Sequence, residues 1–230
     1  MSIHLLTRYG LPRVLSGGGE VTLVWQETFS NNTQNDGHTF PAGSSQENDV
    51  LFLIIAARLG SATESTVPTG FAEVAHVIDG ALNGSIRVYR KIATSSESAT
   101  YEVAWGNTST RVSAALLAYR GVDTDAPIAD SSSNTYASGS EREAPSVDAV
   151  AGGRLLCAYN GVNQVAGTSS WTHACPDHQE NLVSRGNAGN DVNLGLSGEA
   201  VASTAATGSR TATFSQSKPG VIWLAALNPA

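Results

Sequence analysis

The sequence is poor in charge and almost lacks lysine. Charged residues make up 14% of its 230 residues, whereas about a quarter is usual in soluble domains. Lys91 and Lys218 are the only lysines, and the formal net charge is −7. Nucleic-acid binding depends on a basic surface that displaces counterions from phosphate. The composition therefore argues against a nucleic-acid partner.

Long apolar runs are missing as well. The longest run, at 50–57, falls far short of the roughly 18 residues that a membrane span needs, so we expect no membrane partner. The first residues lack the basic leader, apolar stretch and cleavage site of a signal peptide, and we expect synthesis in a cytoplasm. Cys157 and Cys175 are then expected to be thiols. A disulfide between them stays open, because geometry decides it.

Short apolar or alternating segments, separated by Gly, Ser and Asn turns, fill most of the chain. No window longer than a few residues shows a helical period with caps. The segments predict strands at 21–29, 50–57, 71–78, 85–92, 101–105, 111–119, 146–150, 154–160, 171–174, 180–184, 191–201, 210–214 and 220–227. Many short strands of this kind predict an all-β fold, a β-sandwich or a jelly-roll-like fold.

The predicted strands fall into two similar halves, at about 21–121 and 145–230. Residues 50–53 match 154–157, and residues 115–118 match 223–226. This spacing of roughly a hundred residues is too long for a solenoid. We favour one composite sandwich that spans residues 21–230. The joint at 121–145 does not have the composition of a linker before Ser131–Ser133. Two tandem sandwiches remain the alternative.

Residues 1–20 differ from the rest and predict an extended N-terminal arm. Pro12 disfavours a continuous helix there, and Gly17–Gly19 form a flexible hinge before the sandwich. The candidate partner-binding side chains are the apolar residues Leu5, Leu6, Tyr9 and Leu11. Such an arm either docks on a neighbouring protein or lies on its own domain.

Three segments of the first half resemble a known family. They are 67–71 (VPTGF), 88–93 (VYRKIA) and 117–123 (LAYRGVD), the last followed by Pro127–Ile128. Together they resemble a loose β-sandwich family that is found in phage and prophage virion proteins, at the tail or head surface, and in bacterial surface proteins. The resemblance covers about residues 45–130 well and the second half weakly. Its motifs belong to strands and turns, so it implies a fold and a setting but no reaction.

The resemblance implies a non-enzymatic virion structural protein, either a capsid decoration or a tail- or fibre-associated component. Its expected partners are capsid or tail subunits and other copies of itself, since symmetric homo-oligomers are the usual state of such parts. Its expected location is the virion, after synthesis in the cytoplasm of a host bacterium.

A carbohydrate-binding adhesion module is the alternative function. Trp25, Trp105 and Trp171 offer flat rings that a pyranose can stack on, with polar groups beside them. Trp105 and Trp223 lie in apolar alternation and are predicted to be core residues. Trp171 has serine and threonine neighbours, which makes it the candidate residue for binding a host glycan.

Candidate metal sites are weak, and we predict neither a metal nor a cofactor. His173, Cys175 and His178 lie close in sequence, with Cys157 or Asp177 as a fourth ligand, but their spacing matches no standard zinc motif. Calcium could use oxygen atoms at 123–125 or 35–37, although such acidic loops are more often solvated turns. The glycine strings do not follow a phosphate-binding pattern.

Catalytic motifs were sought among acidic residues and serines. Glycoside hydrolysis needs two carboxylates across a cleft, and nothing in the sequence pairs the available acids. The candidates are Glu73, Glu97, Glu102, Glu180 and Glu199. The serine-nucleophile motif G-x-S-x-G is absent from the sequence. We therefore predict that the protein is not an enzyme.

Overall fold

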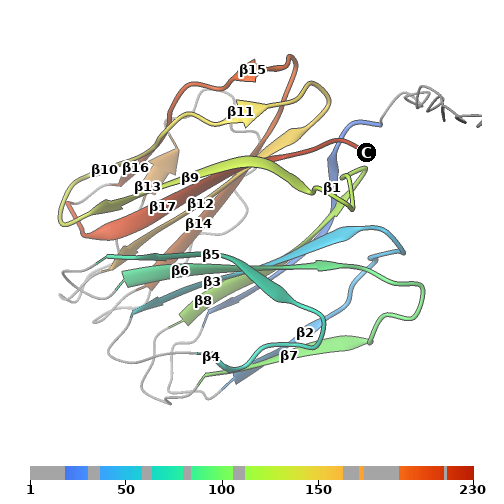
Figure 1. The fold of residues 1–230 in the computed structure, drawn as a ribbon. Helices are drawn as coiled ribbons and strands as arrows, with labels where there is room; N and C mark the ends of the chain where they lie inside the picture. Colours follow the sequence, from blue (N-terminus) through green and yellow to red (C-terminus); the bar gives the residue numbers. More distant parts are fainter. Residues whose placement is uncertain are drawn as a thin grey trace, which may run out of the picture.

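The computed structural model of this chain consists of strands and connecting turns, with no helix among the residues it describes (Figure 1). These residues are 19–30, 37–58, 64–79, 84–105, 112–162, 171–173, 192–214 and 217–230. The all-β prediction is confirmed. The arm residues Leu5, Leu6, Tyr9 and Leu11 lie outside the described residues, as does the strand predicted at 180–184.

The first main sheet contains five antiparallel strands. Their order is β1 (Thr22–Ser30), β8 (Val112–Arg120), β3 (Val50–Arg58), β6 (Gly84–Ile92) and β5 (Ala72–Ile78). β3 and β8 occupy the middle, and both faces of β8 are buried almost to its end. Central strands that are covered on both faces have continuous apolar sequences, which explains the runs at 50–57 and 112–119.

The second main sheet is built in the same manner from the second half of the chain. Its order is β14 (Val192–Ala200), β12 (Arg154–Val162), β17 (Gly220–Leu227) and β9 (Ile128–Tyr136). The two main sheets stack face to face (Figure 1). The largest core cluster lies between them and contains Phe52 and Leu117 from one sheet with Leu156 and Trp223 from the other.

Smaller sheets cover the outer faces of the main sheets (Figure 1). The order β2 (Gly37–Pro41), β7 (Thr100–Trp105) and β4 (Glu64–Thr66) covers the first sheet. The order β10 (Glu141–Ala144), β16 (Arg210–Phe214) and β13 (Trp171–His173), with the pair β11 (Asp148–Ala149) and β15 (Ala205–Ala206), covers the second. Each cover encloses its own apolar cluster. Trp105 and Trp223 are buried in core clusters, as predicted.

The two halves repeat each other strand by strand. The order β1-β8-β3-β6 in one main sheet corresponds to β9-β17-β12-β14 in the other. Leu51 lies opposite Ala118, and the matching residues Leu155 and Ala226 lie opposite each other. The register also shifts at the matching place in both edge strands, between Leu23 and Trp25 in β1 and beside Leu227 in the pairing of β9 with β17. The prediction of two similar halves is confirmed.

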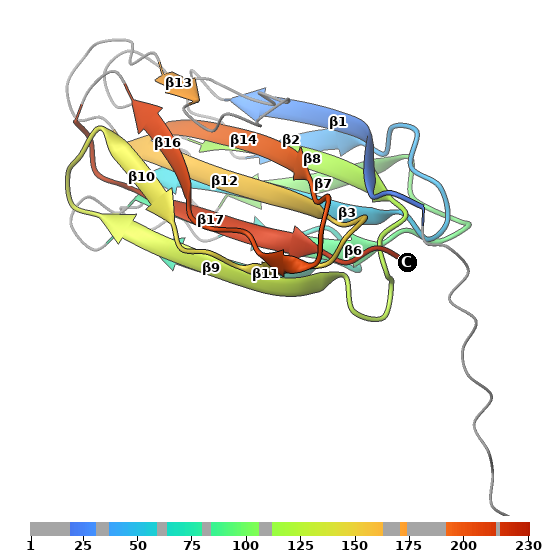
Figure 2. The ribbon, with the colours of Figure 1, turned by 90° about the horizontal axis from the view of Figure 1, so that it is seen from above.

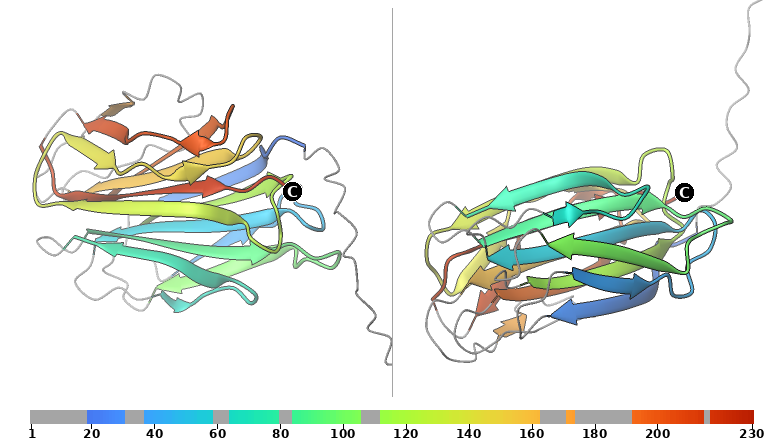
Figure 3. Two further views of the ribbon diagram at one scale, coloured as in Figure 1. Left: turned by 45° about the horizontal axis from the view of Figure 1, so that its top comes forward. Right: turned by 90° about the horizontal axis from the view of Figure 1, so that it is seen from below.

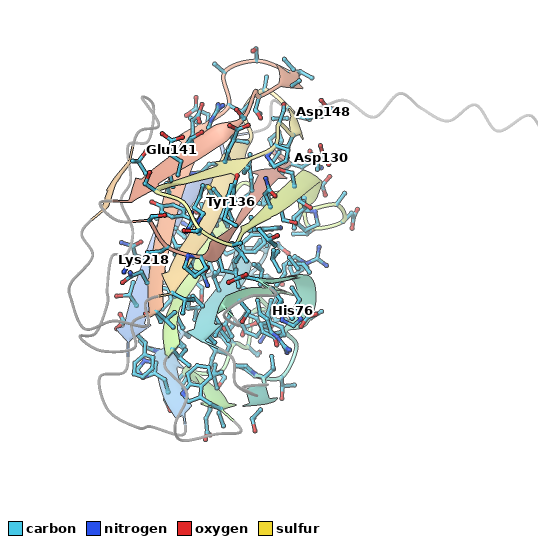
Figure 4. The ribbon with its side chains drawn as sticks, turned by 90° about the vertical axis from the view of Figure 1, so that its left-hand side faces the viewer. His76, Asp130, Tyr136, Glu141, Asp148 and Lys218 are labelled. Atoms are coloured by element: carbon cyan, nitrogen blue, oxygen red, sulfur yellow. The ribbon has the colours of Figure 1, made fainter. Side chains whose placement is uncertain are left out.

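Residues Ser131–Ser133, interpreted from the sequence as the start of a linker, lie within β9, and that interpretation is wrong. Strand β9 has no alternating apolar pattern, because the side chains on one of its faces form hydrogen bonds with polar groups. Asp130 Oδ2 accepts from Asp148 N (2.9 Å), Ser132 Oγ donates to Pro145 O (2.6 Å) and Tyr136 OH donates to Glu143 O (2.6 Å). These side chains hold the connection between β10 and β11 against the sheet edge, as Figure 4 shows for Asp130 and Asp148.

Candidate functional site

Both ends of the described chain lie at one end of the sandwich (Figures 2 and 3). Val21 is 2% exposed and belongs to the central core cluster, and its N–H donates to Gly152 O at 2.9 Å. At the other terminus, Ala230 N donates to Gly121 O at 2.8 Å. The predicted arm is therefore connected to the sandwich beside the C-terminus, and Val21 is the first core residue among those that the structure describes.

Gly121 makes this close approach of the two chain ends possible. Its φ is +78°, which side chains of L-residues rarely tolerate. A Cβ atom at this position would lie 3.0 Å from Glu20 O. The glycine of the L-A-Y-R-G-V-D motif therefore has a structural role where the chain joins the sandwich.

A buried ion pair fixes the neighbouring strand ends. Arg120 Nε and Nη2 donate to the two oxygens of Asp49 at 2.9 Å each, and Asp49 Oδ2 also accepts from Gln46 N at 2.7 Å. The Asp49 side chain is nearly inaccessible, whereas Arg120 reaches solvent. The hydrogen bonds to Asp49 raise the pKa of Arg120 above its ordinary value. This bidentate pair ties the end of β8 to the start of β3.

The candidate glycan-binding residue, Trp171, lies in β13. This strand is the edge strand of the outer cover of the second half, and Trp171 pairs with Phe214 of β16. Trp25, the other candidate, is half-buried and packs against the cluster beneath the first cover. A Cβ atom at Gly43 would lie 2.0 Å from the Trp25 ring, so the backbone of Gly43 already covers one face of this indole.

Glu97 is the centre of a hydrogen-bond network. Its Oε2 accepts from Lys91 Nζ (2.6 Å) and Tyr101 OH (2.5 Å), and its Oε1 accepts from Thr94 N (2.7 Å). Burial works to raise the pKa of Glu97, but the three hydrogen bonds and the Lys91 charge outweigh it and hold the pKa at about 2. Burial and Glu97 raise the pKa of Tyr101. This carboxylate is ionised at neutral pH, and both of its oxygens accept hydrogen bonds.

Two further candidate acids face cations. Arg210 Nε and Nη2 donate to the Glu199 oxygens at 2.7 and 2.8 Å, which forms a bidentate pair. Glu73 Oε2 lies 3.7 Å from Arg87 Nη1. The Glu199–Arg210 pair borders a groove of about 500 Å³, which Arg154 also lines. These carboxylates are paired with arginines and not with one another, as a glycosidase would need.

The candidate metal ligands are separated or engaged in turns. Asp123 Oδ1 accepts from Asp125 N at 2.9 Å and so closes a turn. Cys157 is buried in the core under the second cover, and Asn35, Asp36, Cys175, Asp177 and His178 lie outside the described residues. Within the described ranges, no group of three or more His, Cys, Asp or Glu side chains is placed to hold a metal ion.

Arg142 of β10 is a buried residue that the sequence did not indicate. It is fully buried, and it donates to the carbonyl oxygens of Glu141 (2.8 Å), Gly139 (3.1 Å) and Lys218. Its guanidinium lies 5.1 Å from the centre of the Tyr136 ring. Burial lowers the pKa of Arg142 to about 10, although Tyr136 and Asp79 oppose this change. The sequence of 141–144 (E-R-E-A) does not predict that Arg142 is buried, because a charged residue is expected to face solvent.

His38 is a second residue that the sequence did not single out. Its ring stacks on Phe29 at 4.0 Å and meets Phe40 edge-on at 4.5 Å. Burial lowers the pKa of His38, and the nearby Glu27 opposes the change. The imidazole therefore acts as an aromatic core residue at the end of the first cover.

No helix among the described residues is long and apolar enough to cross a membrane. Comparison with protein-family models, with curated proteins and with solved structures finds no match to this chain. The geometry of the described residues and the resemblance of its sequence motifs are therefore the basis for inferring its function.

Proposed function

We propose that this chain is a non-enzymatic structural component of a bacteriophage virion, a capsid decoration or a tail-associated protein. The observation that carries the proposal is the position of the arm junction. The described chain enters a well-packed sandwich at residues 19–21, beside its C-terminus and at one end. A partner bound to the arm would hold this end and leave the opposite end pointing outward. The resemblance of 67–71, 88–93 and 117–123 to virion proteins supports the same setting.

The ion pairs of the sandwich also support a structural function. Glu97, Glu199 and Asp49 each accept short hydrogen bonds from a cation, and carboxylates paired in this way support a structural role for these residues. Attachment would rest on burial of the apolar arm residues Leu5, Leu6, Tyr9 and Leu11. Burying four such side chains stabilises a contact by roughly 1.5–3 kcal/mol each before the ordering cost is subtracted.

The test is a deletion of residues 1–19. Because Val21 is the first core residue in the described part of the chain, we expect the shortened protein to keep the thermal midpoint of the full chain. Its binding to purified particles that lack this protein should fall to background. A matched control replaces Leu5, Leu6, Tyr9 and Leu11 by serine and keeps the chain length. If either variant decorates particles at full occupancy, the attachment role of the arm is wrong.

A carbohydrate-binding module is the second candidate, favoured by the place of Trp171 on an edge strand of the outer cover. The flat ring of a tryptophan can stack on a pyranose, and polar neighbours such as Ser169, Ser170 and Thr172 can bind its hydroxyl groups. We expect Trp171→Ala to weaken binding on a glycan array while leaving the thermal midpoint unchanged. An array that shows no binding by the unmodified protein would remove this candidate.

A further inference from the structure

We infer that β5 is the edge through which two copies of this chain pair. The inference does not depend on a virion role. A sheet edge exposes unpaired N–H and C=O groups, and proteins normally protect it with charges, prolines, bulges or a covering segment. The two main sheets end in β1 and β5, and in β14 and β9, respectively. These edges differ in how they are protected.

The edge of β9 is blocked by its own side chains. Asp130 Oδ1 accepts from Ser131 N at 2.8 Å, and Asn134 Oδ1 accepts from Thr135 N at 2.9 Å. These bonds occupy two main-chain donors that an added strand would need. β14 is buried from Val192 to Gly198. At β1, the Ser44 hydroxyl lies 3.5 Å from Val24 O, and Glu27 supplies a charge.

Among the residues that the structure describes, none protects the second part of the β5 edge in a comparable way. A register shift between Glu73 and Ala75 disturbs its first part. From Ala75 to Ile78 the pairing with β6 is regular, and the sequence A-H-V-I carries no lysine, proline or acid. Ile78 is 44% exposed, and it is one of two large exposed apolar residues in the described part of the chain. No described strand pairs with the outer side of β5.

A second copy fits this edge for geometric reasons. An antiparallel pairing about a two-fold axis at Val77 sets Ile78 of one copy opposite His76 of the other, because residues directly opposite share a face. The two Val77 side chains then meet beside the central core cluster, to which Val77 already belongs. Closed two-fold dimers are the commonest oligomers. The pairing would join the two five-stranded sheets into one continuous sheet.

The charges near β5 also suit a second copy. Each chain carries a net charge of −7, so two copies repel each other over most of their surface. Next to β5, however, Glu73 lies 3.7 Å from Arg87, and Arg87 Nε donates to His76 Nε2 at 3.1 Å. The positive charge of Arg87 therefore offsets the negative charge of Glu73 beside β5. Figure 4 labels His76, which marks the position of β5 in that view.

The test is sedimentation equilibrium of the full-length protein over a range of concentrations. We expect a dimer of twice the 23.8 kDa chain mass. Ile78→Lys should weaken the dimer at least about tenfold, since it adds an edge-protecting charge and removes apolar burial. The matched control is Val150→Lys, because Val150 is the other exposed large apolar residue, at 38%. This control should leave the association unchanged.

Hydrogen exchange of the unmodified protein provides the second measurement, which does not depend on how the variants fold. Because Asp79 N donates to Gly84 O of β6, the alternate amides, those of His76 and Ile78, face the free edge. These two amides should gain protection as the concentration rises, whereas amides of 131–135 should not. A chain that stays monomeric at the highest soluble concentration overturns the inference. So does a dimer that Ile78→Lys and Val150→Lys weaken equally, or one that forms without added protection at His76 and Ile78.

Discussion

Replacement of Glu97 by glutamine tests the electrostatic account of the first half most directly. The substitution keeps the size of the side chain and one of its two acceptor oxygens, and it replaces the other oxygen by an NH2 group that can only donate. It removes the charge that faces Lys91 at 2.6 Å and Tyr101 at 2.5 Å. A depression of the pKa from 4.5 to about 2 corresponds to an upper limit of about 3 kcal/mol. Because water screens a site near the surface, we expect a loss of about 1.5 kcal/mol at neutral pH.

The lowered pKa of Glu97 determines the pH range in which its stabilising effect is lost. The folded-state pKa of Glu97 lies below its ordinary value, so the ionised carboxylate stabilises the fold fully above a pH of about 4.5. This contribution is lost as the pH falls from about 4.5 toward 2, where the folded protein also takes up the proton. The difference between the parent protein and Glu97→Gln should therefore shrink across this range.

The assay is urea unfolding of both proteins at pH 7, 5, 4 and 3, with the free energy of unfolding extrapolated to water. All other titrating groups are common to both proteins and cancel in the difference. A difference that stays constant between pH 7 and 3 would refute the reasoning, because it would show that Glu97 acts through its shape alone. A difference below a few tenths of a kcal/mol at pH 7 would show that Lys91 and Tyr101 gain nothing from the charge.

Two further substitutions test packing and buried hydrogen bonds. In Gly43→Ala, the alanine would have to adopt a φ of +63°, and its Cβ would collide with the Trp25 ring. The free energy of unfolding in urea should therefore fall by about 2–3 kcal/mol. Gly208→Ala has a similar φ of +71° and no close neighbour, so it should lose about 1 kcal/mol; equal losses would contradict the Trp25 contact. Asn160→Ala leaves Ser85 O and Val221 N without their 3.0 and 2.8 Å bonds and should lose about 3 kcal/mol. A loss below about 1 kcal/mol would mean that other groups satisfy these atoms.

The strands that the sequence predicts well are those whose pattern reflects burial. Apolar runs at 50–57 and 112–119 become central strands, and the match of 50–53 with 154–157 reproduces the register found in the structure. The repeat could be predicted because equivalent core positions in the two halves keep apolar side chains. Trp105 and Trp223 were placed in the core for the same reason.

The strands that the sequence misses are held by contacts that leave no periodic signal. β9 binds the connection after β10 through Asp130, Ser132 and Tyr136, so polar residues stand where apolar ones are expected. β2 and β10 are short cover strands, and Arg142 faces inward because nearby main-chain carbonyl oxygens accept its hydrogen bonds. Most of these partners lie within 20 residues, and only Lys218 O, a third acceptor of Arg142, is distant in sequence. Hydrogen bonds of this kind leave no periodic pattern in the sequence.

The candidate site was only partly predictable. The position of the arm junction follows from pairing between Val21 and Gly152 and between Ala230 and Gly121, which no local pattern reveals. The pairing of Glu199 with Arg210 likewise depends on how β14 and β16 meet. The sequence offers no pairing among the acidic residues, and the structure places Arg210 beside Glu199 and Lys91 beside Glu97.

The shared register shift in β1 and β9 has a consequence for the history of the chain. A bulge at a matching place is not required by packing alone, so its presence in both edge strands, together with a common strand order, indicates duplication of one ancestral coding unit. Each half alone would leave the inner apolar face of its main sheet uncovered, because the central core cluster is built from both sheets. The two halves differ in their ion pairs: one carries Lys91–Glu97, and the other carries Glu199–Arg210, in which the acid lies on the strand and the cation follows it.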